Sequence, residues 1–274
     1  MAADPTWDFL DLRSRGRLLG VLRTELDGML ELAAPASRWH VPTACPGWEL
    51  RDMAGHLVDA TESYLLGFDR ARRGVAGGEP IGVAGMAEAS DTAARAFRRF
   101  PQDELVQRLR VQSDRLLHEF DSLSDTDWSG LSVHDRYLGA FPPRVLAEAL
   151  LGGYTVHGWD VRQGLGGPHS IAGDAADLLV PFTFLFWRAT ADVAALDEPF
   201  EIGIRTYGRN GGDTKVEVSD QGLQFGAGDI DRCQTTLEFD PGTLVLTAYG
   251  RINGGTVRGD PQLADRFRSL FISI

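Results

Sequence analysis

The stretch GGYTVHGWDVRQGLG, residues 152–166, combines the apolar spacing of an amphipathic helix with five glycines and one histidine. In a helix interior each glycine is roughly 1 kcal/mol less favourable than alanine. His157 lies on the inward stripe, with Gly153 one turn before it and Asp160 one turn after it. The glycines at 164–167 are typical of a helix end. The stretch therefore predicts a buried helix whose early glycines leave space beside an imidazole.

The same helical period continues through about the first 195 residues. Apolar residues at three-and-four spacing predict helices over 11–34, 48–73, 86–99, 102–124, 142–164 and 173–195, with a loop at 125–141. Pro142 and Pro143 are placed to open the fifth of these helices, since proline is accepted in a first helical turn. This part of the chain predicts a helical bundle.

The pattern changes after Asp197-Glu198-Pro199. Apolar and polar residues alternate over 200–208, 214–219, 222–228 and 234–240, as in hairpin strands. The segments 241–252 and 261–271 have helical spacing, with GGTVRGD between them. We expect a bundle over residues 1–195 and a small α+β domain over 196–274, a mixed α and α+β fold.

The composition excludes several classes of protein. With 43% hydrophobic and 24% charged residues, the 274-residue chain is typical of a globular protein. A net charge of −12 argues against a nucleic-acid partner. We find neither the apolar core of a secretion signal nor a run of about 18 apolar residues, so no membrane span is expected. Two cysteines are too few for a disulfide framework, which favours a cytoplasmic location.

Two histidines occupy positions suited to metal binding. His56 lies in mid-helix on the inward stripe of 48–73, as His157 does on its own helix. Inward histidines on facing helices are a recurrent way to build a metal site in a bundle. The alternative is that each imidazole is a core residue hydrogen-bonded to a neighbour. The other four histidines are expected at the surface or at caps: His40, His118, His134 and His169.

No other familiar catalytic motif competes with this pair. The sequence has no HExxH, CxxC, P-loop or GxSxG pattern. Cys45 precedes Pro46 and a helix start, where the helix N-terminus can lower the pKa of a thiol. The alternative is that Cys45 is a packed hydrophobic residue.

Three segments carry a family resemblance. They are TACPGWELRDMAGHL (43–57), VHGWDVRQGLG (156–166) and LTAYGRINGGTVRGDPQLADRF (246–267). In this order they resemble motifs of the mycothiol-dependent maleylpyruvate isomerase family. The resemblance implies a DinB-like four-helix bundle followed by a C-terminal sterol-carrier-like α+β domain.

The resemblance also implies a metal centre. Members hold a divalent metal, typically Zn²⁺, with the histidines that match His56 and His157 and with an acid or histidine one turn before the latter. In this sequence that third position is Gly153. Asp160 could act as an additional ligand, or as the hydrogen-bond partner of an imidazole N–H. Gly153 and Tyr154 would then line the pocket for substrate or thiol.

The implied chemistry is mycothiol-dependent. A metal-held thiolate would attack a small electrophile, as a thiol S-transferase or a maleylpyruvate-type cis–trans isomerase, with mycothiol as cosubstrate. Composition rich in Ala, Gly and Arg with few Lys fits an actinobacterial, GC-rich genome. Two alternatives remain open: a family member with altered, metal-independent chemistry in secondary metabolism, or a non-catalytic binding or regulatory protein.

The resemblance further implies a catalytic arginine in the C-terminal domain. Arg251 matches it, and its guanidinium could clamp a substrate carboxylate with two parallel hydrogen bonds. The alternative is a surface arginine that pairs with Asp260 or Asp265. Arg258 is the reserve candidate for the clamp.

Overall fold

The structure, a computed structural model, describes residues 5–166, 169–194 and 196–271. The chain forms two compact units. One spans Phe9–Ile171, and the other begins at Ala172 and includes the first residues up to Asp8. The division falls one helix before the expected boundary near residue 195, because α7 (Gly173–Thr190) shares a hydrophobic core with the C-terminal sheet.

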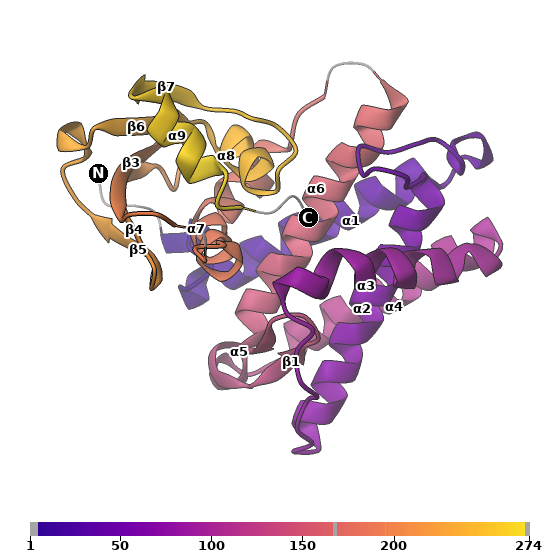
Figure 1. The fold of residues 1–274 in the computed structure, drawn as a ribbon. Coiled ribbons are helices and arrows are strands. Elements are labelled where there is room, and N and C mark those ends of the chain that lie inside the picture. Colours follow the sequence, from indigo (N-terminus) through magenta and orange to yellow (C-terminus); the bar gives the residue numbers. More distant parts are fainter. Residues whose placement is uncertain (1–4, 167–168, 195, 272–274) are drawn as a thin grey trace. The chain divides into compact units, whose positions relative to one another are not determined.

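Four long helices make up the bundle of the first unit (Figure 1). They are α1 (Arg15–Ala33), α2 (Leu50–Arg72), α4 (Gln102–Ser122) and α6 (Pro143–Leu165). Helix α6 packs on α1 and α2, and α4 packs on the same two helices. A shorter helix, α3 (Val83–Ala96), lies on α2 and ends in the 3-10 turn Phe97–Arg99. The expected helices are confirmed to within a few residues.

Local sequence signals set the ends of the two helices that carry the histidines. Glu49 and Asp52 form a reciprocal capping box at the start of α2. Helix α6 opens with Pro143 in its first turn and stops at Gly166, whose φ of 78° suits glycine. The expected ends of these two helices, at 48–73 and 142–164, lie within two residues of the observed ones.

The expected loop at 125–141 is wrong in part. It contains a short helix, α5 (Asp125–Gly130), and a hairpin of β1 (Val133–Asp135) and β2 (Gly139–Phe141). The Ser124 hydroxyl caps α5 by accepting a hydrogen bond from Asp127 N at 3.1 Å. Strands of three residues are too short to show a period of two, which is why the sequence did not indicate them.

The second unit is built on a five-stranded sheet in the order β5-β4-β3-β6-β7. The strands are β3 (Phe200–Thr206), β4 (Gly212–Ser219), β5 (Gly222–Ala227), β6 (Thr235–Phe239) and β7 (Thr256–Gly259). Strands β3 and β6 are parallel, and the other neighbours are antiparallel. The segment GGTVRGD, expected only as a link, supplies the edge strand β7. A strand of this length at a sheet edge carries too few alternating residues to be recognised from the sequence.

Helices complete the core of this unit. Trp187 of α7, Leu244 of α8 (Pro241–Ala248) and Phe267 of α9 (Pro261–Arg268) bury their side chains with those of Ile204 and Leu237 from the sheet. The mixed α and α+β fold class is therefore confirmed. Among the helices of the described ranges, none combines the length and the apolar character that crossing a bilayer requires.

Candidate functional site

The bundle brings His56 and His157 together. His56 lies on α2 and His157 on α6, two helices that pack against each other. Their ring centroids are 4.9 Å apart, with the rings nearly perpendicular at 87°. Both side chains are partly exposed, so a ligand from solvent can reach the imidazoles.

Asp160 fixes the orientation of the His157 ring. Its Oδ2 accepts a hydrogen bond from Nδ1 of His157 at 3.0 Å, one turn along the same helix. The carboxylate is fully buried, with 0% of its side chain exposed. A carboxylate at Nδ1 holds the imidazole in the tautomer whose Nε2 can bind a metal.

Cys45 reaches the same carboxylate from the connector before α2. Its thiol donates to Oδ2 of Asp160 at 3.2 Å. The sulfur, one nitrogen of His157 and one oxygen of Asp160 lie within 4.8 Å of one another, a group of donors that could hold a metal ion. The sequence does not predict this grouping, because Cys45 is expected there as a thiol at a helix start or a packed residue, and Asp160 as an additional ligand or the partner of an imidazole N–H.

The connector lies directly on α6. The backbone N–H of Ala44 donates to the carbonyl of Asp160 at 3.0 Å. A Cβ atom on Gly164 would stand 1.7 Å from the carbonyl oxygen of Pro42, so only glycine permits this approach. Gly164 therefore has a role besides ending the helix. It permits the close approach of the CPGW segment (45–48) to the HGWD segment (157–160).

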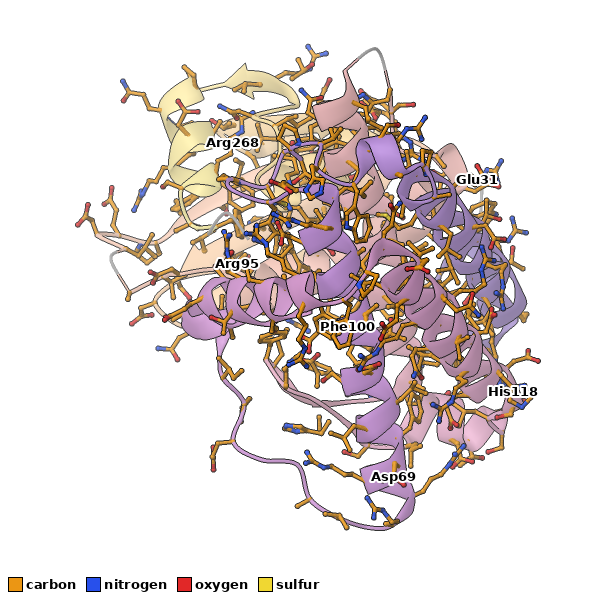
Figure 2. The ribbon with its side chains drawn as sticks, turned by 90° about the vertical axis from the view of Figure 1, so that its right-hand side faces the viewer. Glu31, Asp69, Arg95, Phe100, His118 and Arg268 are labelled. Atoms are coloured by element: carbon orange, nitrogen blue, oxygen red, sulfur yellow. The ribbon has the colours of Figure 1, made fainter. Side chains whose placement is uncertain are left out.

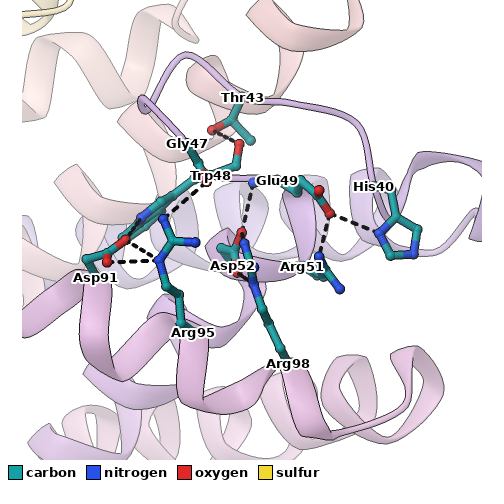
Figure 3. A network of polar contacts seen from close by, with 10 residues as sticks. All are labelled: His40, Thr43, Gly47, Trp48, Glu49, Arg51, Asp52, Asp91, Arg95 and Arg98. Atoms are coloured by element: carbon teal, nitrogen blue, oxygen red, sulfur yellow. Dashed lines mark hydrogen bonds and ion pairs between the residues drawn. The ribbon is translucent and has the colours of Figure 1, made fainter.

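Trp48 packs beside both histidines. Its ring centroid is 5.3 Å from that of His56 and 6.5 Å from that of His157. The indole Nε1–H donates to Asp91 of α3 at 2.8 Å, and Arg95 donates to the same carboxylate at 2.8 Å (Figure 3). Helix α3 thereby fixes the tryptophan that covers the imidazoles.

A partly buried ion pair between Asp52 and Arg98 holds the start of α2 in the same region. Asp52 accepts from Nε and Nη2 of Arg98 at 2.6 and 2.7 Å, and from the backbone N–H of Glu49 at 2.9 Å (Figure 3). Burial by itself would raise the pKa of Asp52. The hydrogen bonds from Arg98 and Glu49 outweigh it and leave the pKa below the usual range. The carboxylate therefore stays charged and rigidly bonded one turn before His56.

Gly153 leaves space on the α6 face that carries His157. Both residues are partly exposed, whereas Tyr154, Thr155 and Val156 between them are buried. A Cβ atom on Gly153 would have no heavy atom within 4 Å. The residue that stands at the expected third ligand position thus contributes no donor, and room remains there for a larger group.

The side chain of Tyr154 is buried in the interior of the bundle. It is 1% exposed, and its hydroxyl pairs with the Ser113 hydroxyl of α4 at 2.7 Å. Burial raises the pKa of the phenol, which keeps it neutral. The structure therefore gives Tyr154 a packing partner on α4.

The two arginines proposed for substrate binding lie in the other compact unit. Arg251 donates from Nη1 to the carbonyl of Tyr249 at 2.8 Å. Arg258 pairs with Oε1 of Glu238 at 2.5 Å. Asp260, one of the alternative partners for Arg251, caps α9 by accepting from Gln262 N at 2.8 Å.

The other four histidines have different surroundings from those of His56 and His157. His118 is exposed on α4 (Figure 2), and His40 is exposed and pairs with Glu49 at 2.9 Å. His134 lies in β1, and the ring of His169 packs at 5.2 Å from that of Trp159.

Comparison with known proteins identifies relatives for this arrangement. The family model for the mycothiol maleylpyruvate isomerase N-terminal domain matches residues 19–162, which include His56 and His157. Two uncharacterized proteins of Mycobacterium tuberculosis, from strains CDC 1551 / Oshkosh and ATCC 25618 / H37Rv, are each 31% identical over 157 residues. These matches cover 55% of this chain and 57% of each relative, so they span little more than half the length of the curated proteins.

Solved structures show the same fold. A mycothiol-dependent maleylpyruvate isomerase and a histidine-to-alanine mutant of it each match with a TM-score of 0.62 at 13% identity. Each match covers 91% of this chain and 95% of the other. The family that the three sequence segments suggested is confirmed: this chain belongs to the mycothiol maleylpyruvate isomerase N-terminal domain family.

Proposed function

We propose that this protein is an enzyme in which a divalent metal, held by His56 and His157, activates mycothiol for attack on a small electrophile. The observation that carries the proposal is the 4.9 Å approach of two imidazoles from different helices, one of them oriented by a buried carboxylate. Membership of the family supports the thiol and the class of reaction.

The residues present fit a divalent metal such as Zn²⁺. Imidazole nitrogen is a preferred zinc ligand, and catalytic zinc sites keep a coordination position for an exchangeable group. Gly153 leaves room for such a group on the His157 face. When bound, a divalent cation stabilises a coordinated thiol as its thiolate.

Two residues of the chain would orient and shield the imidazole pair, namely Asp160 and Trp48. Asp160 keeps the proton on Nδ1 of His157, which leaves Nε2 as the nitrogen that would bind the metal. Trp48, anchored by Asp91, packs against the His56 ring and would shield that side of the imidazole pair.

The mycothiol sulfur would form a bond to an electrophilic carbon of a conjugated substrate, while the electron pair of the double bond moves to the carbonyl oxygen as an enolate. Protonation of the enolate with the C–S bond retained would make the protein an S-transferase. Rotation about the new single bond, followed by return of the electron pair and expulsion of the thiolate, would make it an isomerase.

We further propose that Arg251 binds a carboxylate of the substrate. A planar guanidinium recognises a carboxylate with two parallel hydrogen bonds. Arg258 is less suited to this role because Glu238 already pairs with it. The location of the reaction would be the cytoplasm.

A second candidate is a family enzyme with metal-independent chemistry. It is favoured by Gly153, which supplies no ligand and leaves space that a bulkier substrate could occupy. The two candidates differ in metal content, so one measurement separates them.

The test is elemental analysis of protein purified without a His-tag and equilibrated with excess zinc. We expect about one zinc per chain in the wild type and loss of the metal in His56→Ala without global unfolding. His118→Ala is the matched control, because its imidazole is exposed on α4. Less than about 0.2 zinc per chain in the wild type would refute the metal-dependent proposal. Thiol-dependent turnover that disappears in His157→Ala would exclude a non-catalytic role.

A further inference from the structure

Cys45 is held at a fixed place beside the histidine pair. Its backbone N–H donates to Oγ1 of Thr43 at 3.2 Å, and its carbonyl accepts from Trp48 N at 3.1 Å. The neighbouring Ala44 bonds to the Asp160 carbonyl on α6. The sulfur is therefore positioned by a closed turn packed on α6 and is only partly buried.

Oδ2 of Asp160 joins the thiol to His157. It accepts from Sγ of Cys45 at 3.2 Å and from Nδ1 of His157 at 3.0 Å. In a tetrahedral zinc site with Zn–S near 2.3 Å and Zn–N near 2.0 Å, a sulfur and a nitrogen ligand stand about 3.5 Å apart. Sγ of Cys45 and one ring nitrogen of His157 lie within 4.8 Å of each other. The inference requires a rotation of the Cys45 side chain that brings its sulfur to the ligand separation from Nε2 of His157.

We infer that Cys45 is the third protein ligand of the metal, and that it replaces the donor missing at Gly153. This inference rests on the proposed function of the His56–His157 pair. Two imidazoles and one thiolate complete the three protein ligands that a catalytic zinc site normally has. Because the third donor comes from the connector, the space at Gly153 stays available for the sulfur of the thiol cosubstrate.

The protons balance without a redox step. In the metal-free protein the Cys45 sulfur carries the proton that it donates to Asp160. Metal binding forms a metal–sulfur bond, and the S–H proton passes to solvent. Asp160 retains the hydrogen bond from His157 and acts as a positioning residue for that imidazole, whereas its hydrogen bond from Cys45 is lost with the S–H proton.

Cys45→Ser tests the inference, with Cys233→Ser as the matched control. Cys233 lies in the other compact unit, and burial raises the pKa of its thiol. Zinc affinity is measured by competition with a chelator, and proton release by calorimetry in two buffers of different ionisation enthalpy. We expect Cys45→Ser to weaken zinc binding about tenfold or more and to release about one proton fewer. Cobalt-loaded wild type and Cys233→Ser should show a thiolate-to-cobalt charge-transfer band that Cys45→Ser lacks.

A second measurement uses the wild-type protein and therefore does not depend on whether the variant folds. Zinc should protect Cys45, but not Cys233, from alkylation by iodoacetamide, as followed by peptide mass spectrometry. If the wild type binds zinc while Cys45 is alkylated at an unchanged rate, Cys45 is not a ligand and the inference falls. If the wild type binds no zinc, the proposed function itself falls, so the two failures are distinguishable.

Discussion

Gly153→Ala and Gly164→Ala are expected to change the stability of the same helix in opposite directions. Both glycines lie within α6, and neither has a positive φ. Alanine in a helix interior is more favourable than glycine by roughly 0.5–1 kcal/mol. No heavy atom lies within 4 Å of a Cβ on Gly153, so nothing opposes this gain. We therefore expect Gly153→Ala to raise the free energy of unfolding of the bundle by roughly 0.5–1 kcal/mol.

We expect Gly164→Ala to destabilise the bundle, because the steric clash that it introduces outweighs the gain in helix propensity. Its Cβ would stand 1.7 Å from the Pro42 carbonyl oxygen, half the distance of an ordinary contact, so the connector must move away from α6. Such overpacking costs about 1–3 kcal/mol. The displacement would also loosen the hydrogen bond between Ala44 and Asp160.

The assay is hydrogen exchange of α6 peptides under increasing urea, read by mass spectrometry. A local probe is preferable because two compact units need not unfold as one transition. A Gly153→Ala variant destabilised by more than about 1 kcal/mol would show that position 153 is packed. A neutral Gly164→Ala would show that the connector does not lie on α6.

Three further changes test the surroundings of the histidine pair. Arg98→Ala removes the partly exposed partner of the buried Asp52 carboxylate, which keeps its hydrogen bond from Glu49 N, so urea unfolding should show a loss of about 1–3 kcal/mol. In the wild type the pKa of Asp52 lies below its ordinary value of 3.8, so this contribution is complete above that pH and is lost as the pH falls below it. Gly153→Glu places a carboxylate one turn before the histidine and should tighten zinc binding at least about tenfold in chelator competition; an unchanged affinity would mean that position 153 faces elsewhere. Tyr154→Phe removes the partner of the Ser113 hydroxyl and should cost about 1–3 kcal/mol in urea unfolding while zinc affinity stays the same; a loss of zinc affinity would mean that the phenol contributes to the metal site.

The helices of the bundle were predictable because each carries its own signal. Periodic apolar residues, the capping box of α2 and the proline at the start of α6 are local features. Helix α7 was recognised as a helix but was assigned to the bundle. Its stretch from Leu178 to Trp187 is apolar on most sides, so the sequence does not reveal which unit it packs against. Its partners, the strands and α8, follow it in the chain and form a core that no local pattern describes.

The histidine pair was predictable from the sequence, whereas the contact between Cys45 and Asp160 was not. Inward faces and the family resemblance placed His56 and His157 on facing helices, and the structure sets their rings 4.9 Å apart. The contact of Cys45 with Asp160 depends on a connector that crosses α6, and helical periodicity carries no information about such a crossing. Gly164 was the available signal, but glycine near a helix end has an ordinary explanation as a stop. Gly166 already ends α6, so a second glycine two residues earlier needs another cause, and the Pro42 carbonyl supplies it. The CPGW and HGWD segments therefore lie against each other because Gly164 permits the approach, and any change that separates them should disturb the thiol and the imidazole together.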